Sequence, residues 1–500
     1  MTLDALAIAL LVGGAVVLVS VLGVRVAGKL GVPGLLLYLV LGLALGSAFP
    51  SLHLTDASIA PALGYAALVL ILAQGGFTTP VAQLKSVMWP AIALASLGVA
   101  ISITVVAVPL ILWIGVDTEV ALLIATVLAA TDAAAVFSVM RKLRISERLR
   151  TLLEAEAGFN DAPVVVLVSV ISSGAIGRDP WWSIPLIVLA ELIGGALVGV
   201  AIGYAARWAL PRLALPAIGL YPIAALAFAV VAYGAASVLH TSGFMAVYIA
   251  AVIIGSAPRL PHRRSVIGFA DGLAWIAEIG LFVMLGLLAD VERLPQVIPL
   301  ALVTAGLIIL VARPLAAAAS LLPFRFGIRN TVFAGFAGLR GAVPIVFAAI
   351  PLGLGVPGAE MVFDATLLVV LALLAIQTPL LPKVSEAVGV ILPDEPRAID
   401  VESAPLDAMG TVVLGVEVPE QSGFVGTYVT ELGLPPGAAV SLIQRAGGVV
   451  VPDDNTRLRA GDQLMVVATE ECQVPTEARL RAVSEHGRLA GWQEDGPPPG

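Results

Sequence analysis

The segment EAGFNDAP, which begins at Glu156, sets two carboxylates and an amide inside an apolar stretch long enough to cross a bilayer. Ionised side chains are costly at that depth, so they usually take part in transport or pair with another charge. Glu156 and Asn160 are four residues apart and share a helix face, and Asp161 lies one position further round. Pro163 lacks an amide hydrogen and should free the backbone carbonyl of Phe159 beside Asp161. The oxygen atoms of this segment are therefore candidate ligands.

A second acid, Asp132, follows Thr131 in the preceding apolar stretch. Asp132 lies about 14 residues, roughly 21 Å, from the start of its stretch, and Asp161 lies about ten residues, roughly 15 Å, from the start of the next. Because neighbouring spans run in opposite directions, both acids can approach a common depth near the bilayer midplane. Carboxylates, the Asn160 amide oxygen, the Thr131 hydroxyl and freed carbonyls form a hard-oxygen set that suits an alkali cation.

The elements that must position these residues are membrane spans. Of the 500 residues, 59 % are hydrophobic and 12 % are charged, against about 25 % charged in an ordinary soluble domain. We expect the first apolar stretch to be a span rather than a signal peptide, because it has no basic n-region and no clear cleavage site. The predicted spans cover residues 5–24, 33–50, 60–77, 88–114, 118–140, 151–173, 183–210, 217–239, 243–256, 267–289, 296–321, 329–350 and 361–388.

Thirteen spans, an odd number, place the two termini on opposite sides of the membrane. With the N-terminus outside, sixteen Lys and Arg residues face the cytoplasm and only Arg178 and Arg293 lie outside, which is a strong positive-inside bias. The sequence thus predicts a multi-pass, all-α protein of the cell membrane, with the N-terminus outside and the C-terminal domain in the cytoplasm.

The run GLRGAVPIVF, which begins at Gly338, indicates a discontinuous helix. Glycines stand on both sides of Arg340, and Pro344 frees the carbonyl of Arg340. If residues 183–210 connect two sets of six spans, Asp132 and Arg340 both lie in the fifth member of their set. Two such sets have opposite orientation, which is the inverted-repeat arrangement of secondary transporters, with the site where broken helices meet.

The chain changes character after the last span. We assign residues 1–390 to the membrane domain, 391–410 to a linker, 411–472 to a small α/β domain with short alternating runs, and 473–500 to a disordered tail. From residue 391 onward there are 17 Asp and Glu and 7 Lys and Arg, net −10, which leaves 18 acids and 20 bases, net +2, in the membrane part. An acidic tail argues against a role in binding nucleic acid or anionic lipid.

Taken together, these motifs resemble the cation:proton antiporter-1 family, and especially its branch called cell volume regulation protein A, a potassium/proton antiporter. The run ATDAAAVFSVM is similar to the T-D motif of that family, EAGFND to its E-x-x-x-N-D motif, and GLRGAVPI to its second broken helix. The segment from GTVVLGVEVPEQSGFVG to RLRAGDQLMVVA resembles a TrkA C-terminal domain, which the same branch carries.

The resemblance implies a bacterial inner-membrane homodimer in which Asp161 carries the ion and the proton. It also implies that Glu156 pairs with Arg340 to stabilise the fold. Ala157 stands where many members have a serine, and Gln74 stands where many have an acid, so the exact coordination stays open; the resemblance to this branch favours K⁺ and leaves Na⁺ possible. The residues predicted near the ion are Asp161, Asp132, Thr131 and Asn160, with Phe159, Pro163, Glu278 and Arg313 around them, the last two as helix-pairing residues.

A single carboxylate that binds either a proton or a monovalent cation carries the same charge in both loaded forms, which favours electroneutral exchange. Asn160, in place of a second titrating acid, supports this hypothesis. The alternatives are a Na⁺/H⁺ antiporter of the same fold, a cation channel, although no TVGYG-like filter is present, and a sensor that does not transport. We expect no enzyme activity, no cofactor and no metal beyond the transported cation. The C-terminal domain could bind a small regulatory ligand or serve only for dimerisation.

Overall fold

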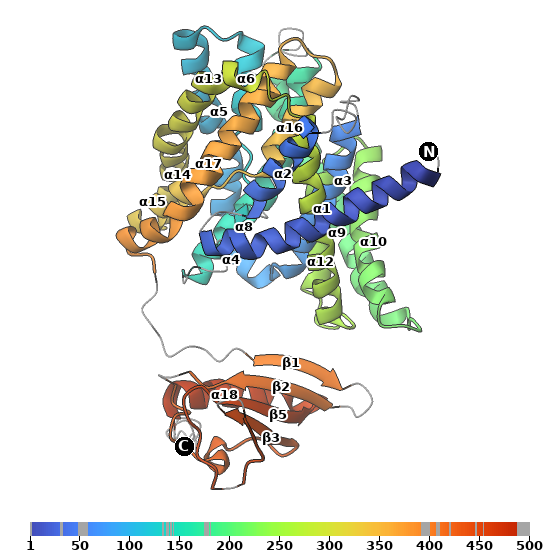
Figure 1. Ribbon diagram of the computed structural model, residues 1–500, viewed down its shortest axis with the longest axis vertical. Helices are drawn as coiled ribbons and strands as arrows, with labels where there is room; N and C mark the ends of the chain where they lie inside the picture. Colours follow the sequence, from blue (N-terminus) through green and yellow to red (C-terminus); the bar gives the residue numbers. More distant parts are fainter. Residues whose placement is uncertain are drawn as a thin grey trace. The chain divides into compact units, whose positions relative to one another are not determined.

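A computed structural model describes residues 3–30, 34–48, 59–132, 135–136, 140, 143, 145–174, 180, 182–391, 401–406, 411–419, 422–445, 448–453 and 455–487. The chain forms two compact units, residues 1–391 and 392–500. The first consists of helices, and the second contains a β-sheet (Figure 1). Each unit is described by itself.

The helices of the first unit follow the predicted spans closely. Among the described residues, eight helices are long and apolar enough to cross a membrane, or nine if one bent pair counts as a single span; a total of thirteen remains a prediction. The helices are α1 (Leu3–Leu30), α2 (Gly34–Ala48), α3 (Ile59–Thr78), α4 (Val81–Ala93), α5 (Val99–Pro109), α6 (Thr118–Val127), α8 (Glu147–Ser172), α9 (Ser183–Ala209), α10 (Leu220–Val238), α11 (Gly243–Gly255), α12 (Arg263–Leu288), α13 (Leu294–Leu307), α14 (Arg313–Leu321), α15 (Ile328–Ala337), α16 (Ala342–Gly353) and α17 (Ala359–Val388).

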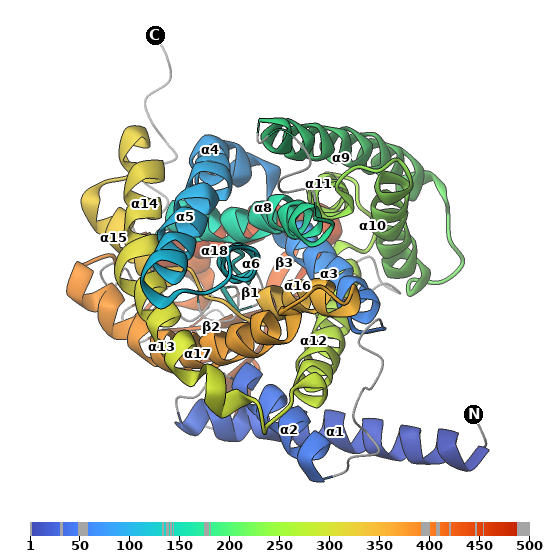
Figure 2. The same ribbon diagram turned by 90° about the horizontal axis from the view of Figure 1, so that it is seen from above.

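The helices pack in two groups, which separate when the unit is viewed from above (Figure 2). Group A contains α1 to α3 and α9 to α12, and group B contains α4 to α6, α8 and α13 to α17. Helices α8 and α16 of group B lie at the boundary, where they contact α3, and α8 also contacts α11. Asp161 is on α8, so the candidate site lies on a helix that faces the other group.

The two halves of the chain contribute to both groups in the same order. Each half supplies its first three spans to group A and its last three to group B, and α9 connects the halves. The fourth span of each half also contains π-helical turns, η2 (Leu94–Gly98) and η3 (Leu110–Ile114) in one and η5 (Ile308–Ala312) in the other. This agreement fits the division into two repeats of six spans.

Both fifth spans are broken, although the sequence locates a break only around Arg340 and predicts residues 118–140 as one span. Helix α6 ends at Val127, and the chain is non-helical at Thr131 and Asp132. Helices α15 and α16 are separated by residues 338–341 and bent by 49°. The glycines around Arg340 thus mark a discontinuous helix, as the sequence predicts. The short half-helices leave backbone groups at their ends that need partners in the interior.

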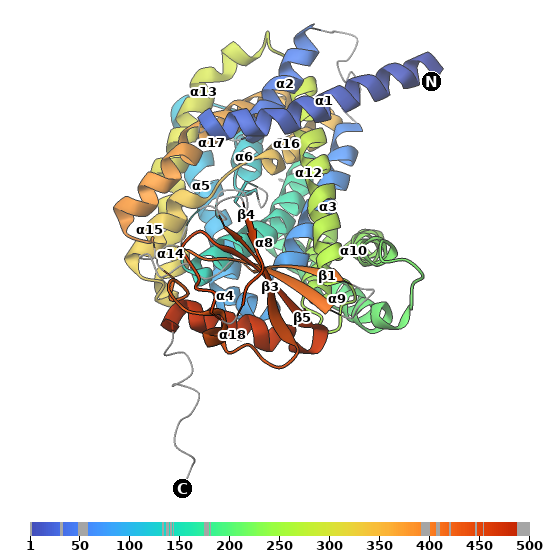
Figure 3. The same ribbon diagram turned by 60° about the horizontal axis from the view of Figure 1, so that its bottom comes forward.

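The second unit holds a five-stranded antiparallel sheet in the order β1-β2-β5-β3-β4. Its strands are β1 (Val401–Leu406), β2 (Thr411–Glu417), β3 (Ala438–Arg445), β4 (Gly448–Val450) and β5 (Gln463–Thr469). Helix α18 (Gln473–His486) lies against the sheet (Figure 3) and buries Leu480 and Val483 in the same core as Leu414 and Val466.

Two boundaries predicted from the sequence are wrong in this unit. Residues 401–406, assigned to the linker, form the edge strand β1, which pairs with β2 along its whole length. An edge strand tolerates polar residues and a proline such as Pro405, so its composition resembles that of a linker. Residues 473–486, assigned to the disordered tail, form α18, whose few apolar positions are enough to bury one face.

Candidate functional site

The two breaks meet and are joined by one backbone hydrogen bond and one side-chain hydrogen bond. The amide of Asp132 donates to the carbonyl of Leu339 at 2.9 Å, and the guanidinium Nε of Arg340 donates to the carbonyl of Leu128 at 2.8 Å. Each break therefore supplies partners that the other break lacks. The arrangement fixes Asp132 and Arg340 at one crossing.

Asp132 caps helix N-termini at this crossing. Its Oδ2 accepts the amide of Ala342, the first residue of α16, at 2.6 Å, and its Oδ1 accepts the amide of Ala135 at 3.2 Å. A carboxylate is stabilised there because helix N-termini carry partial positive charge. A Cβ atom at Gly341 would collide with this carboxylate. Glycine at 341 thus lets Asp132 reach the end of α16.

Arg340 binds backbone carbonyls at helix C-termini, whereas Asp132 binds backbone amides. Its side chain is fully buried, and besides the bond to Leu128 its Nη1 donates to the carbonyl of Gly338 at 3.0 Å. Leu128 is the C-cap of α6, and Gly338 is the C-cap of α15. A buried cation is therefore placed where two helices present partial negative charge. The carboxylate of Asp132 and the guanidinium of Arg340 together compensate the ends of the broken helices.

Asp161 lies on α8, and its carboxylate accepts no hydrogen bond from the described residues. Ser146 caps the N-terminus of α8, which runs without interruption through Pro163. Asp161 is 1 % exposed, and within the part of the chain that the structure describes neither carboxylate oxygen has a hydrogen-bond partner. Its neighbour Asn160 donates from Nδ2 to the Thr131 hydroxyl at 2.7 Å, which ties α8 to the residue before Asp132.

The open oxygen atoms at this point suit an exchangeable ion. Among the described residues, Asn160 Oδ1 also lacks a partner, so it adds to the two oxygens of Asp161. Buried carboxylate and amide oxygens without donors are expensive to leave uncompensated. A proton or an alkali cation would supply the missing charge. The structure thus brings Asp161, Asn160, Thr131 and Asp132 together, as the sequence predicts.

The ion pair predicted between Glu156 and Arg340 is wrong. Glu156 instead pairs with Arg313 at the start of α14, with Nη1 to Oε1 at 2.5 Å and Nη2 to Oε2 at 3.3 Å. Arg313 also donates to the carbonyl of Ala334. Arg340 is committed to backbone carbonyls, and a Cβ at Gly338 would collide with the Arg313 guanidinium, so this glycine makes room for the actual partner. Spacing alone cannot choose between two buried arginines in the second half.

The other predicted residues lie further out. Phe159 contacts Tyr248 of α11. Glu278 lies on α12 in group A, and Arg313 lies on α14 in group B, where it pairs with Glu156. Ala157 is fully buried one helical turn before Asp161.

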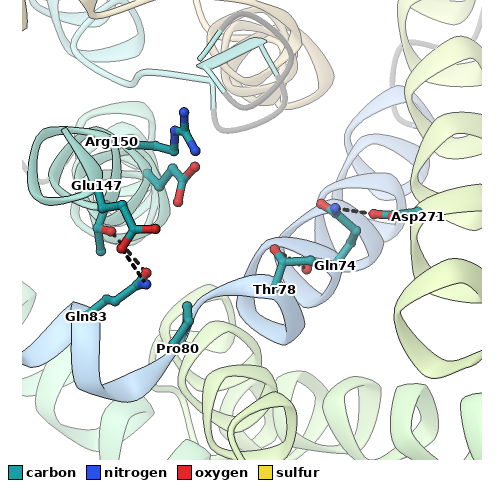
Figure 4. A pocket seen from close by; sticks show the side chains of 9 residues that line it. Gln74, Thr78, Pro80, Gln83, Glu147, Arg150 and Asp271 are labelled. Atoms are coloured by element: carbon teal, nitrogen blue, oxygen red, sulfur yellow. Dashed lines mark hydrogen bonds between the residues drawn. The ribbon is translucent and has the colours of Figure 1, made fainter. Parts of the chain in front are cut away.

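Two cavities open on either side of Asp161. The first, of about 350 Å³, lies between the end of α3 and the start of α8, and Gln74 donates across it to Asp271 of α12 at 2.5 Å (Figure 4). The second, of about 390 Å³, is lined by the far end of α8 and by Glu191, Tyr233 and Phe244. Asp161 lines neither of them. Sequence reasoning missed Asp271 and Gln74 as facing partners because they are distant in the chain.

The second unit has a separate charge pair, in which Asp462 is buried and Arg445 is partly exposed. Arg445 donates from Nε and Nη2 to Asp462 at 2.8 and 2.7 Å, and the amide of Arg459 donates to the same carboxylate at 2.8 Å. Burial by itself raises the pKa of Asp462, but the hydrogen bonds from Arg445 and Arg459 outweigh it and leave that pKa below its usual value. The bond to Asp462 raises the pKa of Arg445.

Comparisons with known proteins match both units of the chain. The model of the sodium/hydrogen exchanger transmembrane family matches residues 15–386, and that of the TrkA-C domain matches residues 413–471. The chain is 33 % identical to the K(+)/H(+) antiporter NhaP2 of Shewanella sp. strain MR-4, over 92 % of this chain and 81 % of that protein. It is 31 % identical to the K(+)/H(+) antiporter NhaP of Alkalimonas amylolytica, over 93 % of this chain and 82 % of that protein.

A solved structure gives the same fold. The sodium proton antiporter MjNhaP1 from Methanocaldococcus jannaschii at pH 8 superposes with a TM-score of 0.66 and 22 % identity, covering 77 % of this chain and 99 % of that one. The expected resemblance to the cation:proton antiporter-1 family is thereby confirmed.

Proposed function

This chain belongs to the sodium/hydrogen exchanger family and is a cation:proton antiporter of multi-pass membrane type, and on that premise we propose that it exchanges K⁺ for protons, one for one, at Asp161. The observation that carries the proposal is the pair of open carboxylate oxygens of Asp161, beside a second acid, Asp132, whose own oxygens accept backbone amides.

This difference between the acids supports electroneutral exchange. Asp132 stabilises two helix N-termini as a carboxylate, so its protonation would weaken both bonds. Asp161 accepts no backbone amide among the described residues, so its carboxylate can bind a proton or a cation in turn. Because both loaded forms of Asp161 carry the same charge, exchange moves no net charge across the membrane. Thr131 and Asn160 complete the site, because the Asn160 amide donates to Thr131 and its amide oxygen has no partner among the described residues.

K⁺ is the favoured cation. The relatives that match more than nine-tenths of this chain are named K(+)/H(+) antiporters. The Na(+)/H(+) antiporter 1 of Methanocaldococcus jannaschii is 29 % identical over 65 % of this chain. We also propose that the protein is a homodimer of the bacterial inner membrane and serves pH, potassium and cell-volume homeostasis.

The test is proton-coupled exchange in proteoliposomes. A pH-sensitive dye inside the vesicles reports proton movement when K⁺, Na⁺, Rb⁺ or Li⁺ is added outside. We expect Asp161→Asn to abolish exchange while Glu386→Gln, which changes an exposed acid near the end of α17, leaves it unchanged. Persistent exchange in a monodisperse Asp161→Asn protein would remove Asp161 from this role, and a response to Na⁺ alone would overturn the K⁺ assignment.

The C-terminal unit is proposed to regulate exchange from the cytoplasm through a small ligand or the partner subunit. It has its own core and sheet, which suits a module that can change state while the membrane unit stays folded. Deleting residues 392–500 should alter the dependence of exchange on pH and K⁺. An unchanged profile would leave only a role in dimerisation, which the mass of the detergent-solubilised protein would report.

A further inference from the structure

One face of α8 runs past Asp161 from the first cavity to the second. Thr151 and Glu154 line the first cavity, and Val165 and Ser169 line the second. Glu154, Asp161 and Val165 are separated by seven and four residues, which keeps them on one face of a helix. An ion that reaches Asp161 from the first cavity must therefore pass the stretch of this face between residues 154 and 161, about 10 Å long.

Gly158 lies on that stretch, and the ring of Tyr248 covers it. Gly158 follows Glu154 by four residues and precedes Asp161 by three. A Cβ atom at Gly158 would lie 2.7 Å from both Cε2 and Cζ of Tyr248, so only glycine fits beneath the ring. The ring also packs edge-on against Phe159, with centroids 5.5 Å apart and planes at 82°. Tyr248 is 1 % exposed and comes from α11, in the opposite helix group.

Packing positions the Tyr248 ring. Its hydroxyl faces the Thr79 side chain, and this contact lies outside ordinary hydrogen-bond geometry. Its backbone packs closely against α3, because a Cβ atom at Gly76 would lie 2.9 Å from the Tyr248 carbonyl oxygen. Thr79 directly follows α3, in the same helix group as Tyr248, so a shift of α8 against α11 can uncover Gly158 without separating the Tyr248 hydroxyl from Thr79.

We propose that Tyr248, seated on Gly158, is the gate between the first cavity and Asp161. When the ring lies on Gly158, the cavity ends before the carrier carboxylate. When the helix group that contains α8 moves against the group that contains α11, the ring leaves the glycine and the path opens. The inference rests on the proposed role of Asp161, to which it adds a positioning residue on the other helix group.

Accessibility of position 161 tests the gate without requiring transport. The chain has one cysteine, Cys472, so Cys472→Ser with Asp161→Cys leaves a single thiol at the carrier position. A membrane-impermeant cationic methanethiosulfonate is applied from the side that the positive-inside pattern assigns to the cytoplasm, and then from the other side. We expect Tyr248→Ala to speed labelling at least about tenfold from the cytoplasmic side only, and Tyr248→Phe, which keeps the ring, to stay within about twofold.

The matched control is Tyr65→Ala, because Tyr65 is an aromatic residue that lines the second cavity. It should not speed labelling from the cytoplasmic side. An unchanged rate with Tyr248→Ala, or an equal increase from both sides, would overturn the gate. All variants are compared as monodisperse full-length protein, so a misfolded variant is recognised before labelling.

Transport gives an independent readout. Gly158→Ala should impair exchange because the added methyl group displaces the ring from its closed position, and Tyr248→Val in the same chain should not restore exchange because it removes the ring that closes the path. Exchange at the unmodified rate in a folded double variant would argue against the gate. Exchange that persists in Asp161→Asn would instead overturn the proposed function, while the labelling result would still report whether Tyr248 covers position 161.

Discussion

The pair formed by Glu156 and Arg313 makes a prediction that separates it from the alternative partner, Arg340. Both side chains of the pair are buried, at 3 % and 4 % exposed. Removing one partner of a buried ion pair leaves an uncompensated charge and costs about 3–5 kcal/mol. Glu156→Leu and Arg313→Met should therefore each destabilise the membrane unit by that amount.

The double variant Glu156→Leu with Arg313→Met should recover most of this loss. Replacing both members of a buried pair with apolar residues of similar volume is often neutral or even stabilising. The coupling free energy between the two positions is then about 3 kcal/mol or more. The carbonyl of Ala334 loses a donor in the double variant, which sets a residual cost of about 1–2 kcal/mol.

Arg340 supplies the control for this cycle. Its Nε and Nη1 donate to the carbonyls of Leu128 and Gly338, so Arg340→Met should also destabilise the protein. Because Glu156 hydrogen-bonds to Arg313 and not to Arg340, combining Glu156→Leu with Arg340→Met should give losses that nearly add. The coupling free energy should stay well below that measured with Arg313.

The assay is unfolding of the purified protein in mixed micelles with increasing SDS, followed by tryptophan fluorescence and repeated by thermal size-exclusion. Both measurements should rank the double variant with Arg313 above either single variant. If the cycle with Arg313 is additive and the cycle with Arg340 shows strong coupling, the pair drawn from the structure is wrong, and the pairing predicted from the sequence is right.

Three further predictions concern the crossing, the ion site and the second unit. Gly341→Ala should force Asp132 off the amide of Ala342 and lower stability by about 1–2 kcal/mol, measured by thermal size-exclusion, whereas Gly280→Ala, where an added Cβ meets nothing within 4 Å, should not destabilise. Ala157→Ser adds a hydroxyl one turn before Asp161 and should lower the half-saturating K⁺ concentration about fivefold, equivalent to about 1 kcal/mol; a dye assay that shows no change would remove position 157 from the ion site. The pKa of Asp462 is lowered in the folded protein. The pairing of Asp462 therefore stabilises the second unit above about pH 4, the pKa of the unfolded state, and this stabilisation is lost as the pH falls further. Hydrogen exchange of β2 and β5 peptides should show the loss, and Asp462→Asn should abolish its pH dependence.

The sequence predicts the parts of this protein that one-dimensional patterns determine. Apolar length locates the spans, and the glycines beside Arg340 locate the break between α15 and α16. The helix turn places Asn160 beside Asp161, and the structure confirms that Asn160 meets Thr131. In each case the signal lies in residues that are close in the chain or in a feature of the whole span.

Contacts between distant segments were beyond such patterns. Either Arg313 or Arg340 could neutralise Glu156 by charge alone, and the choice depends on which carbonyls surround each guanidinium. Tyr248 lies in an apolar helix where an aromatic residue carries no periodic or charge signal, and its importance is visible only through the missing side chain at Gly158. Strand β1 needs the edge of β2 before its polar sequence can be recognised as a strand.

The arrangement of charges at the crossing also supports the proposal that Asp161 exchanges protons while Asp132 stays ionised. Helix N-termini hold the carboxylate of Asp132 through amides of Ala135 and Ala342, and helix C-termini hold the guanidinium of Arg340 through two carbonyls. Both charges stabilise the ends of the broken helices, so a change of protonation at either residue would disturb these helices. Asp161 sits on an unbroken helix and accepts no hydrogen bond from the described residues. Its charge can therefore be satisfied by a proton or a cation without a change in the crossing, which is the condition that one-for-one exchange requires.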